Sequence, residues 1–296
     1  MEEDFRGYFS GVSEYCWTDE TLRGLVVCQP KCPVGYFGLS GMTRCQKWLT
    51  CADYDKHIRV GALFAESNIK NQTIVAAQSK GLDWYFNHGL KNLRAFSSLA
   101  FPRISQYLGD CNNTLLFLQY YPLGSAQNIE QLLQDNRFAH LNTFKTRFNL
   151  CLNLVDFLRR LLHSPGGIPR IMDDMHTLEQ STSQFLIAND FSLIANDLDA
   201  LLLESKLLEC QTPKRAPFVA PEQVCQGNAT RTRYSNKVDI WKVPDLCQFF
   251  LGAHYKANEL FDKKLKIIFD KCKQRKPEDR PNADELYNEL LTLQQK

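Results

Sequence analysis

The hydrophobic pattern of the chain changes abruptly at one point, and this change limits the folds that the sequence can adopt. Up to residue 121 the apolar residues form short strand-like runs with one helical stretch between them. Proline and glycine then interrupt the pattern in Tyr121-Pro-Leu-Gly-Ser125, which is typical of a linker. Beyond it the apolar residues recur mostly at helical spacings. The sequence therefore predicts an α+β fold with a small β-rich part and a larger helical part.

The predicted elements of the first part follow the order strand, strand, helix, strand, strand. Their ranges are 60–67, 71–79, 82–96, 103–110 and 113–121. A polar turn at 68–72 predicts that the first two strands form a hairpin. The second part has predicted helices at 146–163 and 283–293 and two short apolar segments at 183–188 and 191–198. A two-residue Asn-Asp turn between these segments predicts another hairpin.

Length and composition are those of an ordinary globular protein. The chain has 296 residues, of which 44% are hydrophobic and 23% are charged, so it can bury a sizeable core. Its formal net charge of +2 gives no overall field that would attract nucleic acid or an anionic membrane. No run approaches the roughly 20 apolar residues that cross a bilayer, and the start MEEDF is acidic, unlike a secretory signal. We expect no nucleic-acid partner, and membrane association only through an anchor that is not present in this chain.

The cysteines are distributed unevenly. Five of the eleven fall in the first fifth of the chain, at positions 16, 28, 32, 45 and 51. A zinc knuckle and a disulfide-stapled segment are both open interpretations. Only one short pair, Cys28 and Cys32, is present, and the glycine and aromatic residues that follow favour disulfides. We expect residues 1–52 to form a cysteine-rich lumenal leader.

Three sequons agree with a secretory compartment. They begin at Asn71, Asn112 and Asn228, in polar, loop-like stretches, and are candidate glycosylation sites. Such tripeptides also arise by chance, so a cytosolic protein with free thiols remains the alternative.

Two pairs of acidic residues follow predicted elements of the second part. Asp173 and Asp174 come after the long helix, and Asp197 and Asp199 come after the second hairpin. Phosphoryl transfer needs a carboxylate that accepts the proton of the nucleophile and further oxygen ligands that hold Mg²⁺ against the phosphates. Taken alone, such pairs are more often solvated or capping residues, and for Asp173 and Asp199 these roles stay open. Their order within the larger pattern favours a phosphoryl-transfer site.

The order of several short motifs resembles the protein-kinase superfamily. Asp174 stands at the position of the catalytic-loop aspartate, Gln184 at that of the metal-binding asparagine, and Asp197-Leu-Asp199 replaces Asp-Phe-Gly. Three further matches follow in the expected order, namely Val219-Ala-Pro-Glu222, Val238-Asp-Ile-Trp241 and Pro277-Glu-Asp-Arg280-Pro281.

In finer detail, the sequence over about residues 28–293 is similar to one divergent branch of this superfamily, the protein O-mannose kinases. The shared motifs are Cys32-Pro-Val-Gly-Tyr-Phe37, His88-Gly-Leu90, Tyr121-Pro-Leu-Gly-Ser125, Ser183-Gln-Phe-Leu186, Ala195-Asn-Asp-Leu-Asp-Ala-Leu201, Phe218-Val-Ala-Pro-Glu-Gln223 and Asp239-Ile-Trp-Lys-Val-Pro-Asp245. The resemblance implies a bilobal protein-kinase-like domain at 53–294, with a small β-rich N-lobe at about 53–121 and a larger helical C-lobe at about 122–294.

The same resemblance implies a chemistry. Asp174 becomes the base for a sugar hydroxyl, Gln184 and Asp197 become metal ligands, and Asp199 becomes a helper on the metal side. The implied cofactors are ATP and Mg²⁺ or Mn²⁺. The implied acceptor is the 6-hydroxyl of the mannose in an O-linked trisaccharide on a glycoprotein of the dystroglycan type. The family acts in the lumen of the endoplasmic reticulum and is normally held there by an N-terminal signal anchor.

The nucleotide side departs from the usual kinase pattern. Gly61 is the one glycine where a glycine-rich loop is expected, no lysine lies at 59–68, and Gln78 stands where the strand lysine belongs. Lys80 is the candidate replacement, because alternate residues of a strand share a face; a solvated surface lysine is the alternative. The residues expected to contact the nucleotide are Gly61, Gln78, Lys80, Gln119 and Tyr121.

Two functional hypotheses therefore stay open. The retained base and metal residues favour an ATP-dependent glycan kinase. The missing lysines keep a pseudokinase that binds a glycan or a protein partner as the alternative, because an uncompensated phosphate charge weakens nucleotide binding. A third class is a cysteine-rich secreted interaction protein, which would respond to neither ATP nor glycan.

Overall fold

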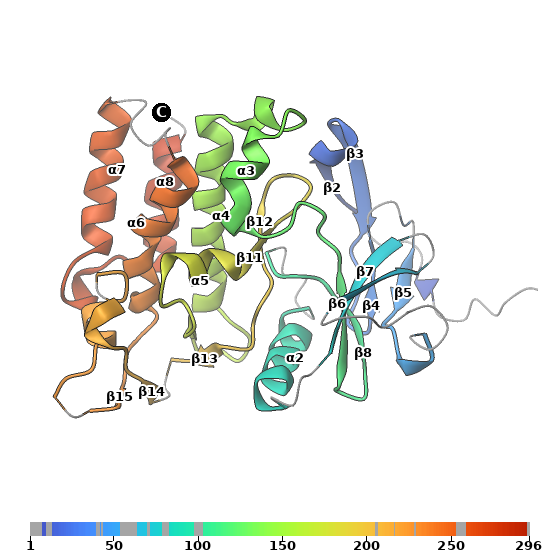
Figure 1. The fold of residues 1–296 in the computed structure, drawn as a ribbon, viewed down its shortest axis with the longest axis horizontal. Coiled ribbons are helices and arrows are strands. Elements are labelled where there is room, and N and C mark those ends of the chain that lie inside the picture. Colours follow the sequence, from blue (N-terminus) through green and yellow to red (C-terminus); the bar gives the residue numbers. More distant parts are fainter. Residues whose placement is uncertain are drawn as a thin grey trace, which may run out of the picture. The chain divides into compact units, whose positions relative to one another are not determined.

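Helices and strands both contribute to the fold, as the α+β prediction requires (Figure 1). The computed structural model describes residues 8–9, 14–39, 42, 44–53, 64–69, 72–78, 83–97, 103–204, 207–215, 217–227, 229–252 and 259–294. The chain divides into two compact units. The first comprises 1–122, 188–190 and 196–199, and the second comprises 123–187, 191–195 and 200–296. Within the described ranges, no helix combines the length and apolar character that a membrane span needs.

The first unit is built around a four-stranded antiparallel sheet in the order β6-β7-β9-β8. Its elements are β1 (Tyr8–Phe9), β2 (Glu14–Asp19), β3 (Leu25–Pro30), β4 (Tyr36–Phe37), β5 (Cys45–Lys47), β6 (Phe64–Ile69), β7 (Gln72–Gln78), α2 (Asp83–Ser97), β8 (Tyr107–Cys111) and β9 (Leu115–Gln119). The predicted hairpin is confirmed, since β6 pairs with β7 in antiparallel register with Phe64 opposite Ala77. The predicted helix is confirmed as α2. The strand predicted at 103–110 begins only at Tyr107.

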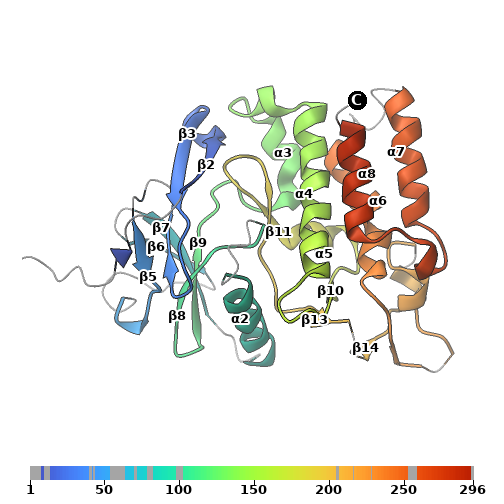
Figure 2. The ribbon, with the colours of Figure 1, turned by 180° about the vertical axis from the view of Figure 1, so that it is seen from behind.

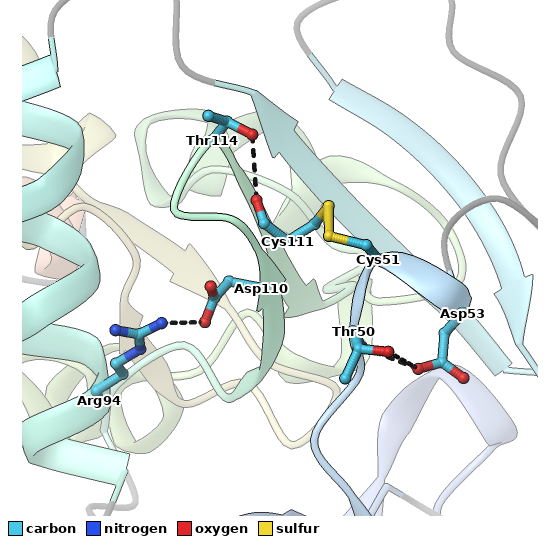
Figure 3. The surroundings of a disulfide bond; sticks show 7 residues. All are labelled: Thr50, Cys51, Asp53, Arg94, Asp110, Cys111 and Thr114. Atoms are coloured by element: carbon cyan, nitrogen blue, oxygen red, sulfur yellow. Dashed lines mark hydrogen bonds and ion pairs between the residues drawn. A yellow bond between two sulfur atoms is a disulfide. The ribbon is translucent and has the colours of Figure 1, made fainter.

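The segment that follows β5 packs on strand β8. The Leu49 amide donates to the Leu108 carbonyl at 2.7 Å, and a Cβ at Gly109 would collide with the Leu49 backbone, so only glycine fits there. A disulfide between Cys51 and Cys111 fastens the same contact (Figure 3). Leu49 also joins an apolar cluster with Phe37, Leu39, Leu108, Leu115 and Phe117. This early segment and the sheet therefore share one core.

The disulfide interpretation of the early cysteines is confirmed. Besides Cys51–Cys111, the bonds are Cys16–Cys28 across the β2–β3 hairpin and Cys32–Cys45. The one cluster with metal-ligand geometry in the described part of the chain consists of Glu14, Cys16 and Cys28. Because Cys16 and Cys28 are bonded to each other, they have no thiolate to offer a metal.

The second unit is mostly helical. Its helices are α3 (Ile129–Gln134), α4 (Phe144–Leu162), α5 (Leu178–Ser183), α6 (Lys237–Leu251), α7 (Glu259–Cys272) and α8 (Ala283–Gln294). Its strands are short and form antiparallel pairs: β10 (Arg170–Met172) with β13 (Leu201–Leu203), β11 (Phe185–Ile187) with β12 (Leu193–Ala195), and β14 (Leu208–Glu209) with β15 (Arg231–Thr232). Helices α6 and α8 lie between α4 and α7, and each of them packs against both α4 and α7 (Figure 2). Cys151 in α4 is bonded to Cys247 in α6.

The predicted hairpin at 183–198 forms, but its turn was predicted too short. Strands β11 and β12 are joined by the five residues 188–192 instead of by Asn189 and Asp190 alone. Phe191 explains the difference. Its ring is buried against Phe138 at a centroid distance of 5.3 Å, and its backbone is left-handed with φ of 56°. Burial of this ring outweighs the local preference for a tight Asn-Asp turn.

Candidate functional site

Helix α2 holds the loop that carries Asp197 and Asp199. His88 Nδ1 lies 2.8 Å from the carbonyl oxygen of Asp199 and donates to it, since a carbonyl only accepts. Asn92, which is 2% exposed, donates from Nδ2 to the Leu198 carbonyl at 2.8 Å. A Cβ at Gly89 would lie 3.3 Å from the Asp199 Cα, so glycine lets the loop lie directly on the helix.

The two acidic residues of this loop are brought together. The Asp199 amide donates to Asp197 Oδ1 at 3.3 Å, with the Asp197 side chain exposed and Asp199 half-buried. Sequence reasoning gave no role to His88 or Asn92, although His88-Gly-Leu90 was part of the resemblance. His88 and Asp199 are 111 residues apart, and no local pattern signals such a contact.

Asp173 and Asp174 directly follow strand β10, and three hydrogen bonds fix the backbone around them. The Asp173 amide donates to the Ala200 carbonyl at 3.1 Å, beyond the register pair Met172 and Leu201. The Met172 amide donates to Asp239 Oδ2 at 3.1 Å. The His176 amide donates to the Asp174 carbonyl at 3.0 Å, and the Asp174 side chain is half-buried. The position of Asp174 is therefore set from the strand pair and from helix α6.

A buried group of polar side chains supports this loop. Asp239 is 2% exposed, and burial raises its pKa to about 6, although Lys242 Nζ lies 3.4 Å away and opposes the shift. The Tyr234 hydroxyl donates to Asp173. The pKa of Asp173 is raised, because the effect of burial exceeds the opposing effect of the hydrogen bond from Tyr234. Asp173 is thus tied to Tyr234, a contact that sequence reasoning did not foresee.

Three of the motifs that resemble kinases meet in the second unit. Arg280, 2% exposed, makes a two-pronged ion pair with Glu222, with Nη1–Oε1 and Nη2–Oε2 distances of 2.6 and 2.9 Å. The Arg280 guanidinium also lies 4.9 Å from the Trp241 ring centroid. The segment after Ala220, helix α6 and the segment before α8 are therefore fastened at one point.

The remaining site candidates are placed in part. Gln184 caps the C-terminal end of helix α5 and leads into β11. Its backbone amide donates to the Thr182 carbonyl, and its side chain is half-buried. The Tyr121 hydroxyl is engaged within the first unit, since it accepts from the Gln106 amide at 3.4 Å and donates to Gln119 Oε1 at 3.5 Å. Burial raises the pKa of Tyr121.

The structure describes only some of the other predicted site residues. Gln78 is the last residue of β7, opposite Leu115. Asn112 lies in the β8–β9 turn, exposed and with φ of 51°. Gly61, Asn71, Lys80 and Asn228 lie outside the described residues.

Sequence comparison identifies relatives over most of the chain. No protein-family model matches the chain. The human protein named "Protein O-mannose kinase" is 32% identical over 287 residues, which is 88% of this chain and 80% of that protein. Proteins of the same name from Macaca fascicularis and Gallus gallus are 32% and 33% identical over 296 and 288 residues, covering 91% and 88% of this chain and 83% and 80% of their own lengths. The chain belongs to the protein O-mannose kinase family.

Proposed function

We propose that this chain is an ATP-dependent glycan kinase. It transfers the γ-phosphate of ATP to the 6-hydroxyl of the mannose in an O-linked trisaccharide on a glycoprotein, an acceptor of the dystroglycan type. The observation that carries this proposal is the 32% identity, over 88% of the chain, to the human protein named "Protein O-mannose kinase". The fixed backbone around Asp174 supports it, because Met172 and Asp173 both donate to partners in other elements.

The proposed reaction makes Asp174 the general base. Asp174 accepts the proton of the mannose hydroxyl while the oxygen of that hydroxyl forms a bond to the γ-phosphorus of ATP. The bond between the γ-phosphorus and the bridging oxygen breaks, and ADP leaves. Position matters for such a step, since a displacement of about 1 Å lowers the rate about a hundredfold. The hydrogen bonds that the backbone amides of Met172 and Asp173 donate to Asp239 and Ala200 limit such displacement.

On the metal side we propose Gln184, Asp197 and Asp199. Their carboxylate and amide oxygens are the donors that Mg²⁺ and Mn²⁺ prefer, and a bound cation would neutralise charge on the phosphates of ATP. His88 and Asn92 support this assignment by fixing the carbonyls of Asp199 and Leu198. The proposed nucleotide contacts are Gly61, Gln78, Lys80, Gln119 and Tyr121.

The proposal includes a bilobal protein-kinase-like arrangement and a lumenal location. Two compact units, one sheet-rich and one helical, support the arrangement. Ten of the eleven cysteines form disulfides, which supports the lumen of the endoplasmic reticulum because such bonds persist in oxidising compartments.

The test is phosphate transfer from γ-labelled ATP to the O-mannosyl trisaccharide with Mg²⁺ or Mn²⁺. We expect the label on the acceptor, and Asp174→Asn should lower the rate by about 10² to 10⁴ because the general base is lost. Asp135→Asn is the matched control, since Asp135 is bound to the exposed Arg137. Transfer by the wild-type protein no faster than by Asp174→Asn would refute the kinase.

Thermal shift would then identify the pseudokinase alternative. A melting temperature raised by Mg-ATP or by glycan, without any phosphate transfer, would indicate binding without catalysis.

A further inference from the structure

A covalently closed segment lies in the second unit between β13 and α6. Cys210 and Cys225 form a disulfide, and strands β14 and β15 pair just outside it. Inside the closed loop the backbone amide of Gln211 donates to the backbone carbonyl of Gln223 at 2.6 Å. The backbone amide of Cys225 donates to the backbone carbonyl of Gln211 at 2.9 Å. The backbone of Gln211 is therefore held on both sides and lies next to the bonded Cys210. We call residues 210–225 the closed segment.

The closed segment contacts the loop of Asp174 through one pair of side chains. Gln211 Nε2 lies 3.3 Å from His176 Nε2. An amide nitrogen can only donate, so the imidazole accepts at Nε2 and carries its proton at Nδ1. His176 follows Asp174 by two residues, and its amide donates to the Asp174 carbonyl at 3.0 Å. A continuous series of contacts thus runs from the disulfide through Gln211 and His176 to the backbone of Asp174.

The imidazole is well placed to transmit this constraint. Its Nδ1 atom is buried and makes no hydrogen bond to any residue in the described part of the chain, so Gln211 is the side chain that holds the ring by a hydrogen bond there. Burial, with Lys242 and Arg215 as further causes, lowers the pKa of His176 and keeps the ring neutral near pH 7. The neutral ring retains the lone pair at Nε2 that Gln211 needs.

We propose that His176 is a positioning residue through which the disulfide-closed segment, by way of Gln211, fixes the loop of Asp174. The inference rests on the proposed function, because it concerns the base of that reaction. In other kinases the segment that follows the metal-binding loop is ordered by phosphorylation. Here a covalent bond restricts the segment, and the side-chain contact passes that restriction to the base.

The first test compares steady-state kinetics of three variants with the wild type. Cys210→Ser with Cys225→Ser, Gln211→Ala and His176→Ala should each lower kcat for the acceptor glycan about tenfold to a hundredfold, with an unchanged KM for ATP. Gln211→Ala should add little in the Cys210→Ser/Cys225→Ser background, because both act through one series of contacts. Gln211→Glu should retain most of kcat, since its carboxylate accepts a hydrogen bond from Nε2 once the ring carries its proton there instead of at Nδ1.

The controls are chosen by place and chemistry. Gln226→Ala removes a glutamine just outside the closed segment, and Cys16→Ser/Cys28→Ser removes a disulfide from the β2–β3 hairpin of the first unit; both should keep the wild-type kcat. A wild-type kcat for Gln211→Ala, or losses from Gln211→Ala and the double serine variant that multiply, would overturn the proposal.

Hydrogen exchange separates this proposal from the kinase activity. Amides of residues 173–177 should exchange faster in Gln211→Ala and in Cys210→Ser/Cys225→Ser than in the wild type, whether or not the protein transfers phosphate. Unchanged exchange there would overturn the positioning role even if transfer is observed. Faster exchange in a protein without transfer would leave the positioning role supported and refute the proposed function.

Discussion

At the scale of single residues, the loop of Asp174 is surrounded by side chains whose charge states are set by burial. Burial raises the pKa of Asp239 to about 6 and lowers that of His176 to about 4. Lys242 acts on both groups, since it opposes the shift of Asp239 and adds to that of His176. Burial therefore shifts the two pKa values in opposite directions, because it disfavours the charged form of each group.

His176 should make the folded protein less stable at mildly acidic pH. Its pKa falls from 6.5 to about 4 on folding, so the unfolded chain binds more protons between these values. The stability that the neutral ring contributes is fully present above pH 6.5 and is lost progressively as the pH falls from 6.5 to about 4. His176→Gln should therefore reduce the loss of unfolding free energy between pH 7 and pH 5 by on the order of 1 to 2 kcal/mol.

Urea unfolding at the two pH values measures this difference. His163→Gln is the matched control, because His163 is exposed and pairs with Asp284 on the surface. If wild type and His176→Gln lost equal unfolding free energy between pH 7 and pH 5, the pKa of His176 would not differ between the folded and unfolded states as described.

At the scale of elements, helix α2 acts as the support of the Asp197-Leu-Asp199 loop. Gly89 makes this possible, because it removes the side chain at the point where the loop backbone lies on the helix. His88 and Asn92 are four residues apart, so they stand on the same side of the helix, and both bond the loop carbonyls. A change at Gly89 therefore reaches the proposed metal ligands through packing alone.

Gly89→Ala should separate stability from activity. Alanine favours the helix by about 1 kcal/mol, which offsets crowding against Asp199 and leaves the melting temperature nearly unchanged. The displaced loop should nonetheless raise the Mg²⁺ concentration needed for half-maximal transfer several-fold. Lys91→Ala, on the exposed side of α2, is the control. A wild-type Mg²⁺ dependence in Gly89→Ala would mean that α2 does not position the metal side.

The elements also show what could be predicted from the sequence. The β6–β7 hairpin and helices α2, α4 and α8 could be predicted because their signals are local, either a polar turn between two strand-like runs or a stripe of apolar residues. The predicted length of the turn between β11 and β12 was wrong, because Phe191 is buried against Phe138, which is distant in sequence. Asp173, Asp174, Asp197 and Asp199 could be found as acidic pairs after elements, whereas their supports in α2 and α6 lie far away in sequence.

At the scale of the whole molecule, the covalent framework accounts for every cysteine but one. Three disulfides lie in the first unit, Cys151–Cys247 and Cys210–Cys225 lie in the second, and Cys272 is a buried free thiol. The pairing could not be predicted, because eleven cysteines allow many connectivities and the partners of Cys111 and Cys151 are distant in sequence. Disulfides of this kind form and persist in oxidising environments.

The Cys151–Cys247 bond should contribute the most to the stability of the second unit. It joins the buried faces of α4 and α6 across 96 residues of sequence, so it greatly restricts the unfolded chain. Cys151→Ala with Cys247→Ala should lower the unfolding free energy by about 2 to 5 kcal/mol, measured by urea unfolding. Cys272→Ala removes an equally buried sulfur without breaking a cross-link, so it should cost only about 1 kcal/mol. If the double variant lost no more than twice the cost of Cys272→Ala, the cross-link would add nothing beyond the packing of its two sulfurs.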